Sequence, residues 1–142
     1  MPKTNQVNWQ PISQMPLIAS MITASLNDTS EHLGTLTKAK DRPHLLDDAT
    51  IDRVEQVHTE QMQYIDIYTR QIARWRTAKP SAVQAKELDR MEKQNQQLRD
   101  VTTDVLALAG ELRKGTIDRI LGMSDLELGL QTLLRTQSPE RR

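Results

Sequence analysis

Apolar residues recur at every third or fourth position along three long stretches of the chain, which is the spacing of one face of an α-helix. Pro16 suits the first turn of a helix, because its missing N–H has no intrahelical partner there. Pro43 cannot continue that helix and disfavours helical geometry at Arg42. The pattern predicts a first helix over residues 16–40, with its apolar face made by Met15, Ile18, Ile22, Leu26, Leu33 and Leu36.

Two further apolar stripes follow. The second predicts a helix over residues 48–77, closed by Pro80. The third helix should start at Ser81, whose hydroxyl is placed to cap it while the Gln84 side chain reaches back in a capping box. Gly115 is placed to end it. At 1.5 Å per residue, these two helices would be about 45 and 50 Å long.

Two shorter helices are predicted after Gly115. Thr116 is placed to cap the first, and Ser124 with Glu127 forms a second capping box. This last helix would bury four leucines, Leu126, Leu130, Leu133 and Leu134. The predicted fold is all-α, a single domain over residues 1–142.

We expect an antiparallel helical bundle of three long helices plus two short C-terminal helices, because short connections make neighbouring helices antiparallel. Residues 1–13 and 136–142 should form tails, with Trp9 packing back on the body. In helix content and in the segments "RPHLLDDATIDRV" and "GTIDRILGMSDLELG", the chain resembles small bacterial helical proteins. No named family, and so no functional residue, follows from that resemblance.

The densest group of chemically reactive side chains lies at the predicted corner, residues 40–58, which contain two histidines and four aspartates. Asp47 at the N-cap would place Leu46 and Ile51 as a hydrophobic staple around it. Asp48 and Asp52 would then lie in the first turn, where the helix dipole stabilises negative charge. Pro43 is the stop signal and Leu45 is expected to pack under the corner. These capping rules explain most of the acids without any catalysis.

The alternative for the same stretch is a metal-dependent bundle enzyme centred on Glu55 and His58. Their Glu-x-x-His spacing is the one by which ferritin-like helices present two ligands to a di-iron centre. That chemistry requires a second such pair, which the sequence lacks. A mononuclear site of His32, His58 and a carboxylate remains open. We assign no catalytic, cofactor-binding or metal residue from sequence.

The segment from Arg70 to Lys79 is the strongest local basic feature, since it places Arg70, Arg74, Arg76 and Lys79 around Trp75. Basic residues with an interleaved aromatic ring suit phosphates and a stacked base. Cations also gather at helix C-termini because the terminal carbonyls favour them. A nucleic-acid-associated accessory factor is therefore an alternative function, but nucleic acid is an unlikely partner.

Composition narrows the function further. Nineteen Lys and Arg offset nineteen Asp and Glu, so no global field draws the protein to nucleic acid or to an anionic membrane. The absence of cysteine and of a secretory leader predicts a cytoplasmic protein. No nucleophile elbow or glycine-rich phosphate loop is present, and Gly34 and Gly110 are instead expected to permit close helix packing. The chain is predicted not to be an enzyme and to need no cofactor.

The leading prediction is a protein–protein interaction or scaffold module that forms a homodimer. The second and third helices carry apolar residues outside their main stripes, namely Val57, Tyr64, Ile67 and Leu106. Polar residues inside the stripes, Gln61, Asn95 and Thr102, would fix the register between helices at some cost in stability. The C-terminal helices could instead fold back over the apolar surface, covering it with Ile117, Ile120, Leu126 and Leu130.

Overall fold

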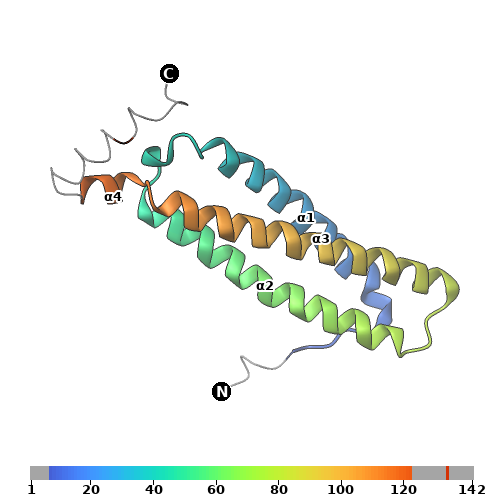
Figure 1. Ribbon diagram of the computed structural model, residues 1–142. Coiled ribbons are helices and arrows are strands. Elements are labelled where there is room, and N and C mark those ends of the chain that lie inside the picture. Colours follow the sequence, from blue (N-terminus) through green and yellow to red (C-terminus); the bar gives the residue numbers. More distant parts are fainter. Residues whose placement is uncertain (1–6, 123–133, 135–142) are drawn as a thin grey trace, which may run out of the picture.

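The computed structural model describes residues 7–122 and residue 134 (Figure 1). Its regular elements are all helical, and the described residues contain no strand. The all-α prediction, with three long helices, is therefore confirmed for this part of the chain. The elements, in chain order, are η2 (Ile12–Gln14), α1 (Met15–Lys38), η3 (Pro43–Leu45), α2 (Asp48–Arg76), α3 (Ala82–Arg113) and α4 (Ile117–Leu121).

The helices start where the capping residues predict. Asp47 accepts a hydrogen bond from the Thr50 backbone N–H at 2.8 Å, which caps α2. Ser81 and Gln84 form both hydrogen bonds of the predicted capping box at the start of α3. Thr116 caps the short α4. The first and last residues of the three long helices lie within two residues of the boundaries predicted from sequence.

The corner between α1 and α2 is a structural connection, but its packing differs in one position from expectation. Leu46 packs against the apolar cluster that contains Ile51, as the staple predicts. Leu45 does not pack under the corner, because its side chain is 66% exposed at the end of the η3 turn. Gly115 is needed for a close approach: a Cβ there would lie 2.8 Å from the Pro43 Cγ. This approach joins the end of α3 to the corner.

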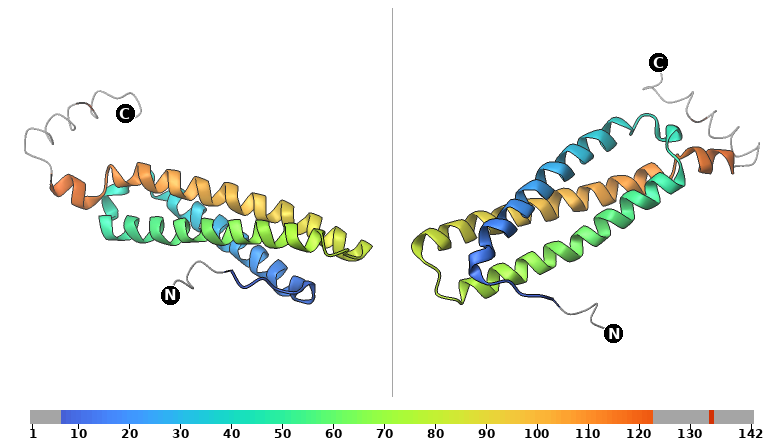
Figure 2. Two further views of the ribbon diagram at one scale, coloured as in Figure 1. Left: turned by 90° about the horizontal axis from the view of Figure 1, so that it is seen from below. Right: turned by 180° about the vertical axis from the view of Figure 1, so that it is seen from behind.

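The long helices do not contact one another equally. α2 and α3 lie side by side and run in opposite directions, and α1 packs across α3 (Figures 1 and 2). The backbones of α1 and α2 come close at few positions, so side chains must bridge a wider separation there. The result is a three-helix arrangement with one open side.

Two apolar clusters form the core. One joins the N-terminal half of α1 to the end of α2 and the start of α3, and the other lies at the opposite end of the molecule. The first consists of Met15, Ala19, Ile22, Tyr68, Ile72, Trp75, Leu88 and Met91. The second consists of Leu36, Ile51, Val54, Val105, Ala109 and Leu112. Each cluster draws on all three long helices, which explains why the sequence stripes are apolar on one face only.

Gly34 and Gly110 do not serve close helix packing, contrary to expectation, since a Cβ built at either position meets nothing within 4 Å. Of the two short C-terminal helices predicted, α4 is present, whereas the one expected to begin after Ser124 lies outside the described residues. Within the described part of the chain, no helix combines the length and the apolar character required to cross a membrane.

Candidate functional site

A groove lies between α1 and α2 on the open side of the molecule. It contains a cavity of about 700 Å³, bordered by the N-terminal arm (residues 7–11), α1 and α2, and a smaller one of about 240 Å³ that Leu98 of α3 also lines. Both cavities are lined by Tyr64 and Tyr68. We call this surface the α1–α2 groove and define it by six of its apolar lining residues, Leu17, Met21, Val57, Tyr64, Ile67 and Tyr68.

Exposed apolar side chains concentrate in the α1–α2 groove. Leu17, Met21, Val57 and Tyr64 are 54%, 41%, 50% and 57% exposed, and they make up four of the eight exposed large apolar residues among those described. Val57 and Tyr64 are seven residues apart on α2, so they share one helix face. An apolar surface gathered in a hollow, with exposure this high, is typical of a site that binds a ligand or a partner.

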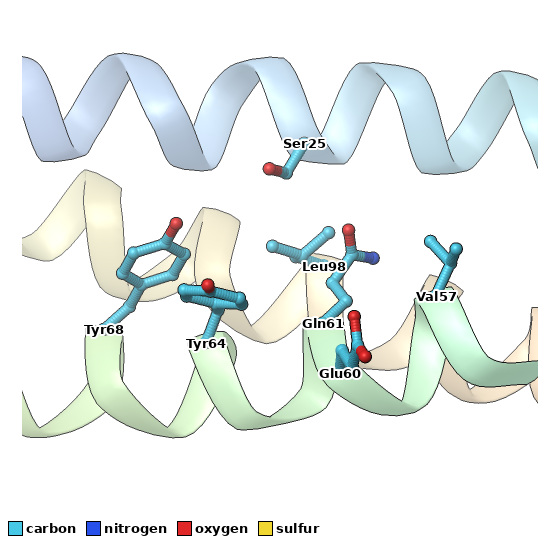
Figure 3. A pocket seen from close by; sticks show the side chains of 7 residues that line it. All are labelled: Ser25, Val57, Glu60, Gln61, Tyr64, Tyr68 and Leu98. Carbon is cyan, nitrogen blue, oxygen red and sulfur yellow. The ribbon is translucent and has the colours of Figure 1, made fainter. Parts of the chain in front are cut away.

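The two tyrosines give the groove a polar component as well. In Figure 3 their rings rise from α2 toward α1, next to the Glu60 and Gln61 side chains. Burial of Tyr68, reinforced by the neighbouring Tyr64, raises the pKa of the Tyr68 hydroxyl. Tyr68 therefore keeps its proton at neutral pH and remains able to donate a hydrogen bond. The charged residues lining the groove are Glu60, Asp66 and Arg70.

Next to the groove, a polar layer links all three long helices. The Gln61 side-chain amide of α2 donates to the hydroxyl of Thr29 on α1 at 2.9 Å and to that of Thr102 on α3 at 2.8 Å. On the α2–α3 side, the Asn95 amide donates to the Ile65 carbonyl at 3.1 Å. These contacts lie where the sequence predicts register-fixing polar residues. Each of these donors reaches its acceptor only when the helices keep their present positions along their axes. The layer therefore disfavours sliding of one helix along another.

The proposed Glu-x-x-His ligand pair is separated by the fold. Glu55 accepts a hydrogen bond from the Arg113 guanidinium at 2.6 Å, while His58 is 3% exposed and faces His32 instead. The structure thus brings His32 and His58 together, as the mononuclear alternative requires, but Glu55 is engaged elsewhere. Burial, and then the neighbouring His58, lowers the pKa of His32. Within the described residues, no group of three or more His, Cys, Asp and Glu side chains is placed to hold a metal ion.

The basic segment is largely occupied by contacts within the chain. The guanidinium groups of Arg70 and Arg74 lie 5.5 and 4.8 Å from the centre of the Trp9 ring. Arg76 forms ion pairs with two acids of α3, Asp89 and Glu92. Arg70, Arg74 and Arg76 therefore all have partners within the chain.

Hydrogen bonds to the end of α2 also hold the N-terminal arm in place. Trp75 is 3% exposed and donates from its indole nitrogen to the Gln10 carbonyl at 3.0 Å. The Gln10 backbone N–H in turn donates to the Gln71 side chain at 2.8 Å. Trp9 does pack back on the body, as predicted, but the described part of the predicted tail is bound to α2 along with it. This arm forms one wall of the larger cavity.

Sequence reasoning found part of the groove and missed part. Val57, Tyr64 and Ile67 were expected on an open apolar surface, and all three line the groove. Leu17 and Met21 were missed, although their four-residue spacing beside the main stripe of α1 was a usable signal. Leu106, expected on the same surface, lies on α3 and does not line either cavity; the open surface belongs to α1 and α2.

Comparisons of this chain with known protein families, with curated proteins and with solved structures find no match.

Proposed function

We propose that this protein is a helical interaction module that forms a two-fold symmetric homodimer through the α1–α2 groove. The observation that carries the proposal is the concentration of exposed apolar side chains on the one side where the long helices leave each other uncovered. A second copy presents the same surface, and self-complementary pairing is the commonest solution among soluble oligomers. Each copy would cover the other's Tyr64, Val57, Leu17 and Met21.

Charge placement along α2 supports a second copy as the occupant. Glu60 and Arg70 both line the groove, ten residues apart on the same helix. Suppose that two copies of α2 pair antiparallel, with the two-fold axis at the level of Ile65 along the helix. Glu60 of each copy then lies opposite Arg70 of the other. The pairing thus produces two symmetric contacts of opposite charge, with the two Tyr64 rings meeting close to the axis. Such complementarity selects orientation and partner more than it adds affinity.

In this proposal each subunit is an antiparallel bundle of three long helices with two short C-terminal helices, and the second copy supplies the missing fourth side. The cytoplasm is the proposed location, in keeping with a chain that has no cysteine. The competing arrangement is an intramolecular one, in which the C-terminal helices fold back over the groove. Ile117 and Ile120 of α4 line neither cavity, so the covering residues would have to lie beyond Gly122. The mass in solution distinguishes the two.

Sedimentation equilibrium at micromolar concentration tests the proposal. We expect a mass about twice the 16.2 kDa of the chain, and a return to the monomer mass in Tyr64→Glu, which places a charge at the centre of the contact. Val83→Glu is the matched control, because Val83 is 79% exposed on α3 and does not line the groove. A wild-type mass near 16 kDa would refute the dimer.

A charge-swap series tests the pairing itself. Glu60→Arg alone should weaken the dimer, because it places two cations opposite each other at both symmetric contacts. Adding Arg70→Glu in the same chain restores opposite charges and should restore the dimer. A double variant no tighter than the single one would rule out this orientation even if the protein is dimeric.

A further inference from the structure

The two histidines that the fold brings together, one on α1 and one on α2, form a site outside the groove's apolar lining. His32 Nδ1 and His58 Nε2 lie 3.4 Å apart, and their ring centres are 5.0 Å apart. The residues come from helices whose backbones approach each other at few positions. Contact between these two rings is therefore a specific product of the tertiary structure.

The tautomer of His58 is fixed by its second nitrogen. His58 Nδ1 lies 2.7 Å from the carbonyl oxygen of Val54. A carbonyl oxygen only accepts, so Nδ1 carries the proton and donates it, and Nε2 is left with a lone pair directed at His32. Metal-binding histidines are typically held in this way, with one ring nitrogen donating to a carbonyl and the other facing the metal.

The distance between the two nitrogens, which is long for a hydrogen bond, also matches two bonds to one zinc ion. Hydrogen bonds from N–H groups in proteins are commonly about 2.7 to 3.2 Å long, whereas these nitrogens are 3.4 Å apart. Two zinc–nitrogen bonds of about 2.0 to 2.1 Å, meeting at a tetrahedral angle, hold their nitrogens about 3.3 to 3.4 Å apart. Bonds of that length along the ring axes place the ring centres about 5 Å apart, close to the 5.0 Å found here.

We propose that His32 Nδ1 and His58 Nε2 together bind a divalent transition-metal ion of the zinc type, in tetrahedral geometry. No third His, Cys, Asp or Glu completes the site among residues 7–122 and 134. Water fills the two remaining positions, which it reaches because His32 is only partly buried. A site with two protein ligands is weaker and more readily exchanged than a structural zinc site with four.

The bound ion joins α1 to α2 where few other contacts do so. His58 directly follows Val57, which lines the groove, so the ion sets the spacing of the two helices at one end of the α1–α2 groove. Binding to the folded chain alone stabilises it by mass action. The site is separate from the dimer contact and does not depend on it.

Zinc titration of tag-free protein, followed by calorimetry, tests the site. The chain offers a matched set, since its third histidine, His44, is exposed and takes no part in the pair. We expect one ion per chain in the wild type and in His44→Ala, and affinity lower by about tenfold or more in His32→Ala. Co²⁺ serves as a second probe: a tetrahedral site should give intense visible absorption, which His32→Ala should abolish.

His58 is buried, so its substitution can damage the fold by itself, and His32→Ala is the informative variant. The wild type should melt at a higher temperature with zinc than without it, and His32→Ala should show no such rise. The proposal is overturned by any of three results: no saturable binding of zinc, equal affinity in His32→Ala and wild type, or loss of binding in His44→Ala.

Discussion

α3 packs against both other long helices, but the chemistry of the two contacts differs. Between α2 and α3, ion pairs occur at three levels: Arg76 with Asp89 and Glu92, Arg99 with Asp66, and Arg113 with Asp52 and Glu55. In the described part of the chain, α1 makes no ion pair with either neighbour. Its polar contacts are uncharged, such as the 2.8 Å hydrogen bond from the Thr23 hydroxyl to the Gln94 side chain.

This difference sets the α2–α3 pair, which is aligned by ion pairs, apart from α1, which is not. The ion pairs between α2 and α3 are partly exposed, so each contributes little to stability, but together they specify how the two helices align. α1 relies on apolar burial and on a few partly buried hydrogen bonds, whose loss leaves polar groups without partners. α1 is also the helix that leaves the groove open. We infer that α2 and α3 form the platform and that the position of α1 determines the shape of the groove.

The largest expected effect comes from a residue that serves both contacts. Leu88 of α3 is fully buried in the cluster that joins α1, α2 and α3. Leu88→Ala should lower the free energy of unfolding by about 2 to 5 kcal/mol, through lost burial and the cavity left behind. Urea denaturation measures it. Val83→Ala on the same helix is the control, because Val83 is 79% exposed, and an equal loss there would contradict the assignment of the core.

The attachment of α1 is tested more selectively at the polar layer. Gln61→Leu removes the amide that bridges Thr29 and Thr102 and should lower the free energy of unfolding by about 1 to 3 kcal/mol. Hydrogen exchange should show faster opening in α1 than in the α2–α3 pair. Gln56→Leu, at an exposed position of α2 that lines neither cavity, should leave both unchanged. Uniform loosening of all three helices would argue against a separate platform.

The first turn of α2 depends on an N-cap, Asp47, whose carboxyl group titrates. Hydrogen bonds from the side chain and the backbone of Thr50 lower the pKa of Asp47. A lowered folded-state pKa means that the cap contributes fully above the ordinary aspartate range and is lost as the pH falls through the folded-state pKa. Asp47→Ala should therefore lower the melting temperature at pH 7, with the difference from wild type shrinking in acid.

Two controls make this measurement specific. Asp47→Asn keeps a capping side chain without a titrating group, so it should retain stability better than alanine and lose the pH dependence. Asp41→Ala removes an exposed acid from the preceding loop and should have little effect. A constant difference between Asp47→Ala and wild type from pH 7 to pH 2 would mean that the carboxylate is not the cap.

The smallest expected effect is a gain within α1. A Cβ at Gly34 would meet nothing within 4 Å, so Gly34→Ala should raise the free energy of unfolding by about 0.5 to 1 kcal/mol by reducing the entropy of the unfolded chain. Gly115→Ala is the opposite case, since its Cβ would collide with the Pro43 ring and should destabilise the corner. The melting temperatures of the two variants should shift in opposite directions. A lower melting temperature in Gly34→Ala would show that a side chain at this position of α1 does meet its neighbours.

Much of the fold follows from local rules that depend on residues close in sequence. Asp47, Ser81 and Thr116 cap the helices that their spacing predicts, because a cap bonds to N–H groups within one turn. The apolar stripes identify the buried faces because helix periodicity is itself local. Leu45 shows the limit: the staple rule places Leu46 against Ile51, but no capping rule covers Leu45, whose side chain stays exposed at the end of the η3 turn.

The sequence by itself determined the helices, their ends and their apolar faces, since these depend on interactions a few residues apart. Only the tertiary structure decided how the faces combine: that α1 packs on α3 and leaves α2 partly uncovered, that Leu17 joins Tyr64 in one groove, and that Glu55 turns to Arg113 while His58 turns to His32. The distances between these groups depend on how whole helices cross. That crossing is set by the packing of many side chains at once, so no spacing along the chain encodes it.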